Sequence, residues 1–240
     1  MKRLVLPRQH GAWVMVALPF LIGMTAGRPH WIHLFLFPGW FFLYISSSPL
    51  LLFVKKKKNR GMYVKGFAAY TSIAMLFLSV PLLFYPELLL FAGFLLPMLG
   101  INIIFARRKN ERAFLNDLFA IMGLCLGGPA AYLIGSGTWE ETALYIWAAS
   151  VGFFIGSVFF VKMFIREKNN STFKWYAWAY HSLLVILSFV FGFIGLGAAY
   201  LFSFFRIFLF YKKPLQPKHT AIIECSNSVY FFIVMIFWLV

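Results

Sequence analysis

Long apolar runs, each near the length of a membrane-spanning helix, follow one another along almost the whole of this 240-residue chain. A helix of about 20 apolar residues crosses a hydrocarbon core that is roughly 30 Å thick. Nine runs approach this length, at residues 11–27, 31–54, 66–85, 88–106, 117–136, 142–165, 176–194, 196–211 and 220–240. Lipid offers the backbone no hydrogen-bond partner, so each run must be helical. The sequence therefore predicts an all-α, polytopic transmembrane bundle of about nine helices, forming a single domain over residues 1–240.

Two of these runs allow more than one interpretation. Only the sequence GLG at 195–197 separates the seventh run from the eighth. One segment over both would be far too long for a single crossing, so we predict two helices and leave the boundary between them open. The first run has a basic start and TAG at 25–27, features that a cleaved signal peptide can share. Because eight further runs follow, we expect an uncleaved first helix.

The composition supports a membrane protein over a soluble one. The chain is 62% hydrophobic and 12% charged, whereas soluble domains are roughly 45–50% apolar and about 25% charged. The net charge of +15 would suggest nucleic acid in a soluble protein, but here the charges lie between apolar runs, so no nucleic acid partner is expected. With only Cys125 and Cys225 present, neither a disulfide framework nor a thiolate zinc site is predicted.

The basic residues gather on one side of the predicted membrane. With the N-terminus inside, 20 of the 22 Lys and Arg residues fall in cytoplasmic segments. The exceptions are Arg28, outside, and Arg206, within the eighth run, while Glu87, Glu140 and Glu141 all fall outside. Cytoplasmic loops normally carry this excess of positive charge. We therefore predict a bacterial cytoplasmic-membrane protein with its N-terminus inside and its C-terminus outside.

The stretch RKNERAFLND at 108–117 places several polar groups just before the fifth run. Arg108, Arg112 and Asn116 share one face if the stretch is helical, because they are four residues apart. Asn116 and Asp117 are also good N-cap residues for the fifth helix. One interpretation is therefore a basic loop that ends in a capped helix. The other is an inward-facing polar pocket lined by Glu111, Arg112, Asn116 and Asp117.

The stretch PRQHGAW at 7–13 precedes the first run and allows the same two interpretations. Trp13 is typical of an interface anchor, and Arg8 contributes to the topology. His10 has a side chain that titrates near neutral pH and can contact an anionic head group. Arg8 and His10 are therefore candidate ligand-binding residues.

Three ionisable residues, Lys162, Arg206 and Glu224, lie inside spans or at their edges. A charge at mid-helix costs roughly 2.5–3.5 kcal/mol on insertion scales, so such a group usually faces a partner or a cavity. Lys162 and Arg166 share a face near the end of the sixth run, where both can also reach the interface. Glu224 lies beside Ser226, Asn227 and Ser228 in the ninth run. We expect Glu224 to pair with Lys162 or Arg206.

Glycine and proline positions suggest where helices approach closely or bend. Gly123/Gly127 and Gly152/Gly156 have the spacing that lets two helices pack closely. Prolines at 19, 49, 81, 97 and 129 would kink or end helices. No nucleotide-binding, zinc-protease or serine-hydrolase motif occurs, and the five histidines are scattered, so no metal or other cofactor is expected.

The motifs PRQHGAW and RKNERAFLNDL resemble the YwiC-like family of bacterial integral membrane proteins. More distantly, the order of features is similar to the UbiA-type intramembrane prenyltransferases. The segments that carry this second resemblance are LPFLIGMTAG at 18–27, LNDLFAIMGLCLGGPAAYLIGSG at 115–137 and VFFVKMFIREKNN at 158–170. That resemblance implies a UbiA-like helix arrangement and a prenyl diphosphate held with Mg²⁺ by Asp-rich loops.

The two corresponding loops depart from the UbiA pattern. LLFVKKKKNRGMYVKG at 51–66 has no acidic residue, and IREKNNSTFK at 165–174 has only Glu167. Two hard cations need several oxygen ligands, which one carboxylate cannot supply. The resemblance therefore implies the fold without the metal-dependent prenyl transfer, and it assigns no catalytic residue.

These observations lead to a hypothesis with two rivals. The chain is expected to bind an amphipathic anionic lipid, or an isoprenoid or quinone-type ligand, in a basic cavity that faces the cytoplasm. The rivals are a divergent prenyltransferase or lipid-modifying enzyme and a transporter of small solutes or ions. The candidate ligand-binding residues are Arg8, His10, Glu111, Arg112, Asn116, Asp117, Lys162, Arg166 and Glu224. The lipid bilayer is the expected environment of the chain, and the sequence does not identify a protein partner.

Overall fold

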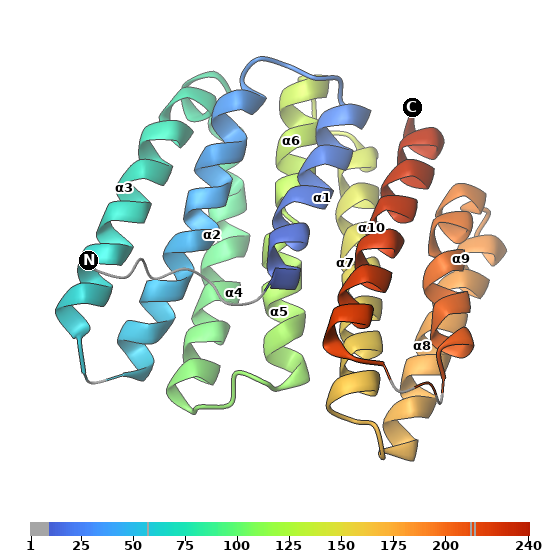
Figure 1. Ribbon diagram of the computed structural model, residues 1–240. Helices are drawn as coiled ribbons and strands as arrows, with labels where there is room; N and C mark the ends of the chain where they lie inside the picture. Colours follow the sequence, from blue (N-terminus) through green and yellow to red (C-terminus); the bar gives the residue numbers. More distant parts are fainter. Residues whose placement is uncertain (1–9, 57, 212, 214) are drawn as a thin grey trace. The chain divides into compact units, whose positions relative to one another are not determined.

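The computed structural model describes residues 10–240 apart from residues 57, 212 and 214, and this part of the chain is helical without strands. In chain order the helices are α1 (His10–Ala26), α2 (His33–Lys55), α3 (Arg60–Phe84), η1 (Pro86–Leu88), α4 (Leu89–Arg107), α5 (Phe114–Leu124), α6 (Gly127–Ser136), α7 (Glu141–Ile165), α8 (Ser171–Val190), α9 (Ile194–Leu209) and α10 (Pro217–Leu239). Figure 1 shows them as long, mostly antiparallel rods. The prediction of an all-α fold is confirmed.

Each predicted span corresponds to a helix or helix pair within the described residues. Six helical segments are long and apolar enough to cross a membrane, and one of these combines α5 and α6 over Phe114–Ser136. Two further apolar helices, Gly11–Ala26 and Ile194–Leu209, are shorter. Helix α8 corresponds to the seventh predicted span but is not among these apolar segments, so the nine crossings stay a prediction. The chain is thus a membrane-type helical protein.

The chain divides into two compact units, Met1–Trp147 and Ala148–Val240, which we describe separately. The first contains α1 to α6 and the start of α7. The second contains the rest of α7 and α8 to α10. The single-domain organisation and the UbiA-like arrangement stay predictions.

In the first unit, α1 packs closely along α6, α2 along α3, and α4 along α5. Glycines make the first of these contacts possible. A Cβ atom on Gly23 would lie 2.0 Å from the carbonyl oxygen of Gly128, and one on Gly135 would lie 2.4 Å from that of Gly27. Small residues let helix backbones approach in this way within a membrane. The closest α1–α6 approach therefore involves glycines that the predicted spacing pairs did not single out.

The predicted glycine pairs contact side chains of neighbouring helices instead. A Cβ atom on Gly127 would lie 2.6 Å from the indole nitrogen of Trp40, whereas one on Gly123 would make only ordinary contacts with Met98 and Leu95. In the second unit, Gly152 faces the Tyr200 hydroxyl and Gly156 faces His181. These glycines accommodate large side chains.

The fifth crossing is broken between α5 and α6. Pro129, in the first turn of α6, has no N–H to donate to the carbonyl of Cys125. That carbonyl accepts instead from the Gly128 amide at 3.1 Å, and the Leu126 amide bonds to Gly123 at 3.2 Å. The shorter-range bonds tighten the chain and end the regular helix. The other four prolines lie inside α1 to α4, so of the five only Pro129 coincides with a break between described helices.

The turn between the seventh and eighth predicted helices lies at residues 191–193, before GLG at 195–197. Gly192 has a φ of 80°, a left-handed conformation that glycine adopts without strain. Gly195 and Gly197 lie inside α9, where Cβ atoms would come within 2.1 Å of the Trp238 ring and 2.9 Å of the Phe189 ring. The GLG glycines therefore make room for aromatic rings, and Gly192 forms the turn.

In the second unit, α9 packs against both α8 and α10. Phe231 of α10 stacks on Phe153 of α7, with ring centroids 4.1 Å apart, and on Tyr200 of α9. Tyr200 and Tyr180 donate to the carbonyl oxygens of Ala149 and Gly152 at 2.9 and 2.8 Å. Aromatic stacking and hydrogen bonds to α7 carbonyls thus hold these four helices together.

The α1–α6 contact should be sensitive to the first methyl group added to it. We predict that Gly23→Ala lowers the free energy of unfolding by about 1–3 kcal/mol, because the new Cβ atom meets backbone that cannot rotate away. Unfolding in mixed detergent micelles measures the change. Gly93→Ala in α4 is the matched control, since nothing lies within 4 Å of its Cβ position. Equal stability of the two variants would contradict the packing argument.

The arrangement of the first unit also predicts which loops are reached from the same side. The α2–α3 and α4–α5 loops lie at one end of this unit, and the α3–α4 and α6–α7 connections lie at the other (Figure 1). In a protein whose native cysteines are replaced by alanine, Lys58→Cys and Asn110→Cys should be protected from a membrane-impermeant thiol reagent in intact cells. Thr138→Cys should react. Labelling of Lys58→Cys and Asn110→Cys from opposite sides would contradict the threading.

Candidate functional site

The loop between α4 and α5 differs from the predicted helical stretch. Residues 108–113 form turns, with Lys109 at a φ of 55°. Helix α5 begins only at Phe114, and its N-cap is Ala113, which has no side chain that could cap the helix. Arg108 and Arg112 therefore do not share a helical face with Asn116, and that prediction is wrong. Asn116 and Asp117 lie in the first turn of α5, so the prediction that they cap it is also wrong.

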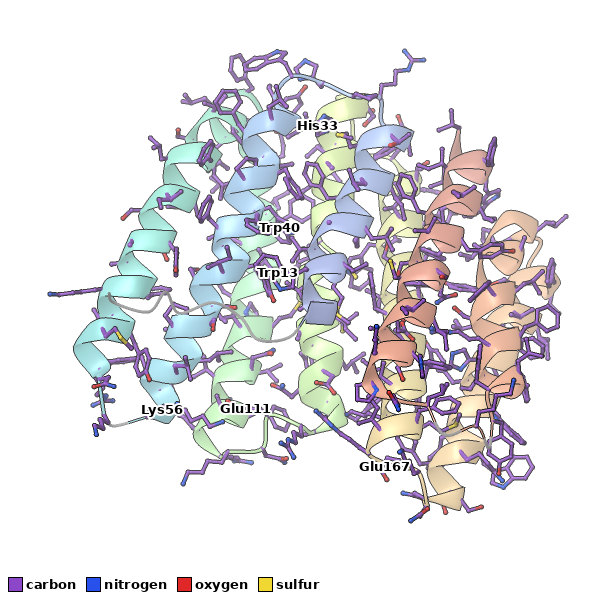
Figure 2. All side chains as sticks on the ribbon, in the orientation of Figure 1. Trp13, His33, Trp40, Lys56, Glu111 and Glu167 are labelled. Carbon is purple, nitrogen blue, oxygen red and sulfur yellow. The ribbon has the colours of Figure 1, made fainter. Side chains whose placement is uncertain are left out.

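Glu111 connects this loop to α2. Lys55, the last residue of α2, forms an ion pair with the Glu111 carboxylate, and Figure 2 shows Glu111 at the end of the first unit near Lys56. The Asn116 side-chain amide donates to the Glu111 carbonyl oxygen at 2.9 Å. The side-chain oxygen of Asn116, Oδ1, is buried without a hydrogen-bond partner. Three of the four candidates here, Glu111, Asn116 and Asp117, are partly buried, whereas Arg112 is exposed.

The two candidates near the N-terminus cannot be placed. Arg8 lies outside the described residues, and His10 begins α1 with a side chain that is also outside them. Trp13, in the same motif, packs between α1 and α2 against Phe41 and Tyr44, at centroid distances of 5.2 and 5.9 Å. Its ring contributes to helix packing as well as to any interface anchoring.

The opposite end of the first unit carries one well-defined acidic group. The Tyr132 hydroxyl donates to Glu140 at 2.5 Å, and the Thr138 hydroxyl donates to it at 3.0 Å. These two hydrogen bonds, that of Tyr132 foremost, hold the pKa of the Glu140 carboxyl below its ordinary value. The carboxylate therefore stays charged and fixed beside the end of α6.

In the second unit, Arg206 is the partner of Glu224. Nη1 of Arg206 donates to the Glu224 carboxylate, and Nη2 lies 3.5 Å from the Ser157 hydroxyl. Its guanidinium carbon is 4.3 Å from the centroid of the Phe160 ring, and only 1% of the residue is exposed. Arg206 therefore does not reach water. It is held in the interior by a carboxylate, a hydroxyl and an aromatic face.

A second polar contact lies one helical turn away. Ser203 of α9 donates to Asn227 of α10 at 3.0 Å, parallel to the Arg206–Glu224 pair. Nε of Arg206 and Nδ2 of Asn227 have no hydrogen-bond partner. The α9–α10 contact thus contains two polar interactions, Arg206–Glu224 and Ser203–Asn227, in agreement with the predicted polar patch around Glu224.

Lys162 and Arg166 lie in different surroundings although they are one turn apart. Lys162 is buried within α7, whereas Arg166 is exposed just beyond the end of that helix. Glu224 pairs with Arg206. Across the described part of the chain, no three His, Cys, Asp or Glu residues come together as a metal site would require.

A concave site in the second unit lies where α7 and α9 end and α8 begins. It has a volume of about 410 Å³ and is lined by Met163, Phe164, Glu167, Lys168, Asn169, Asn170, Ser171, Lys174, Tyr211 and Lys213. We call this the basic pocket, because three lysines face one carboxylate. Its Glu167, labelled in Figure 2, is held by the Asn170 side chain at 2.8 Å.

Lys174 is fixed at the edge of the basic pocket by aromatic rings. Its ammonium lies 5.0, 5.1 and 5.2 Å from the centroids of Trp175, Trp178 and Tyr211, and 3.3 Å from the Tyr211 hydroxyl. The ammonium is thereby held in place while still facing the pocket. Sequence reasoning missed Lys168, Lys174, Tyr211 and Lys213. The spacing of Lys174 with Trp175 and Trp178 was a readable signal, but Tyr211 approaches only through the fold.

The buried ion pair makes a prediction about stability. Glu224→Gln should lower the free energy of unfolding by about 3–5 kcal/mol, because it leaves the Arg206 charge buried without its counter-ion. Unfolding in mixed micelles measures the loss. The control is Glu141→Gln at the exposed start of α7, where the carboxylate only accepts from the Tyr145 hydroxyl. A Glu224→Gln protein as stable as this control would show that the pair does not stabilise the fold.

Comparisons with known proteins place the chain in a family. The model of the YwiC-like protein family matches residues 6–132. A protein of Bacillus subtilis (strain 168), described as "Uncharacterized protein YwiC", is 41% identical over 98% of both chains. A protein of Haemophilus influenzae (strain ATCC 51907 / DSM 11121 / KW20 / Rd), described as "Uncharacterized protein", is 32% identical over 98% of both chains. No solved structure gives a significant match. The chain belongs to the YwiC-like family.

Proposed function

We propose that this membrane protein binds the anionic head group of an amphipathic molecule in the basic pocket. The observation that carries the proposal is the excess of positive charge there: Lys168, Lys174 and Lys213 line the pocket together with a single acidic residue, Glu167. Phosphate and carboxylate groups are the anions that lysine ammonium groups pair with in proteins. The head group is therefore a phosphate or a carboxylate.

The apolar residues that line the basic pocket favour an amphipathic ligand over a free ion. Met163 and Phe164 line the pocket, and both belong to a buried apolar cluster with Phe160, Ala177 and Ile207. Pockets of about 300–1,000 Å³ with apolar walls and a few polar groups are typical of small-ligand sites. A volume of about 410 Å³ accommodates a head group and the first part of its tail.

Binding by this route needs no metal ion. Each lysine near an anionic lipid surface contributes about 1 kcal/mol of attraction, and the aromatic rings around Lys174 hold its charge in place before the ligand arrives. The lysines would neutralise the head group in the role that Mg²⁺ has in prenyl-diphosphate enzymes. We therefore propose binding without metal-dependent prenyl transfer.

The positive-inside pattern supports a cytoplasmic position for the basic pocket. The pocket lies at the α7–α8 loop and the end of α9, which the predicted threading assigns to the cytoplasm. The cytoplasmic leaflet is also the one that carries anionic lipid. The N-terminus inside and C-terminus outside are part of this proposal.

Transport is the second candidate, and one observation favours it: the buried Arg206–Glu224 pair. Ionisable residues inside a membrane commonly mark ion or substrate paths. Farther along the same helices, however, the Phe153, Phe231 and Tyr200 rings stack on one another and fill the interior. A filled interior beyond the pair supports one-sided binding more than conduction, so we place binding first.

Native mass spectrometry with added lipids tests the proposed binding. Phosphatidylglycerol and a polyprenyl phosphate should both bind more tightly than zwitterionic phosphatidylcholine. Lys174→Gln and Lys213→Gln should each weaken the anionic lipids about fivefold, the equivalent of about 1 kcal/mol per lysine. Preference for the polyprenyl phosphate over phosphatidylglycerol would identify an isoprenoid ligand, and equal binding would identify a general anionic lipid site.

Two further variants provide a control for this experiment and a test of the other candidate residues. Lys218→Gln is the matched control, because Lys218 is exposed in the first turn of α10 and does not line the basic pocket. Arg112→Ala tests the first-unit candidates Arg8, His10, Glu111, Arg112, Asn116 and Asp117, which stay predictions as ligand contacts, as do Lys162, Arg166 and Glu224. If wild type, Lys174→Gln and Lys218→Gln retain the same lipids in the same amounts, the basic-pocket proposal is wrong.

A further inference from the structure

We infer a second ligand site in the first unit: Trp40 and Tyr44 of α2, with the α5–α6 break that Trp40 contacts, bind the carbonyl oxygen of a hydrophobic, membrane-soluble molecule. This site is independent of the basic pocket, which lies in the second unit.

The first observation is the place where α6 begins. Its first residue, Gly127, is buried in the interior of the fifth crossing, as are all residues from Gly127 to Ile134. A helix N-terminus carries a partial positive charge. Membrane proteins use broken helices of this kind to direct such ends at polar groups of a ligand. The Gly128 and Ala130 amides at this start bond to the Cys125 and Leu126 carbonyls, so the donors for a ligand oxygen here are side chains that reach the break.

The second observation is an indole N–H without an acceptor. Trp40 is 7% exposed, and its Nε1 has no hydrogen-bond partner. A Cβ atom on Gly127 would lie only 2.6 Å from this nitrogen, so glycine at that position is what lets the indole reach the break. Figure 2 shows Trp40 directed inward from α2. By contrast, the indole of Trp147 donates to the Met122 carbonyl of α5 at 3.0 Å.

The third observation is a second unpaired donor on the same face of α2. Tyr44 lies one turn from Trp40, and its hydroxyl is also buried without a partner. Side chains four residues apart are neighbours on a helix surface. Within lipid, a donor without an acceptor is strongly unfavourable, so two on one face indicate a ligand that supplies acceptors.

The chemistry of the neighbouring groups selects the ligand class. The two donors are neutral, which suits a carbonyl oxygen, whereas a buried anion would need a positive counter-charge. The Trp13 ring packs on Phe41 and meets Tyr44 edge to face. Aromatic side chains of this kind pack well against planar apolar rings. A lipid-soluble molecule with a carbonyl group on an apolar ring fits both features.

A pair of probes that differ only in their carbonyl groups tests this inference. Full-length protein in lipid nanodiscs, labelled with ¹⁵N-tryptophan, is titrated with decylbenzoquinone and, separately, with decylbenzene. The Trp40 indole signal, assigned from its loss in Trp40→Phe, should shift with the quinone and not with decylbenzene. Trp40→Phe and Tyr44→Phe should each weaken quinone binding about three- to tenfold, the effect of one hydrogen bond.

The controls separate this site from general partitioning and from the basic pocket. Trp139→Phe removes an exposed indole that packs on Phe91 and should leave quinone affinity unchanged. Lys174→Gln should not affect the quinone, and Trp40→Phe should not affect anionic lipid in native mass spectrometry. An unshifted Trp40 signal, or equal affinity of wild type and Trp40→Phe for the quinone, would overturn the inference and leave the basic-pocket proposal standing.

Discussion

The bilayer core contains no water to satisfy a backbone amide or carbonyl, and most of the structure depends on that constraint. Every crossing has to pair its backbone internally, which leaves only helices. The same constraint decides where charges lie. Lysines and arginines collect at helix ends, and the arginine that lies deep in the second unit, Arg206, is enclosed by Glu224, Ser157 and the Phe160 ring.

Close packing in this chain relies on the absence of side chains as much as on their presence. Without a hydrophobic force to drive helices together in lipid, association depends on backbone approach and on interior hydrogen bonds. Gly23 and Gly128 provide the first in the α1–α6 contact, where neither position has room for a Cβ atom. The Ser203–Asn227 contact and the Arg206–Glu224 pair provide the second between α9 and α10. Each unit thus has its own means of fixing one helix against another.

The two proposed sites are places where charged or hydrogen-bonding groups are not satisfied in this way. Three lysines around an apolar floor leave a surplus of charge in the basic pocket, and the unpaired Trp40 and Tyr44 donors leave unsatisfied hydrogen bonds beside α6. A structural role accounts for Lys55–Glu111, where each charge has its counter-ion. A structural role does not account for the surplus lysines of the basic pocket.

The sequence by itself determined the membrane-type character of this chain, its helical class and, through the motifs at 7–13 and 108–117, its family, because hydrophobic length and local motifs are properties of short segments. It also identified Glu224 as a group in need of a cation. Only the tertiary structure decided that Arg206 is that cation, that Gly192 and not GLG forms the α8–α9 turn, and that Tyr211 completes the aromatic surround of Lys174. These outcomes depend on residues distant in sequence that share one space, and spacing along the chain carries no record of which helices become neighbours.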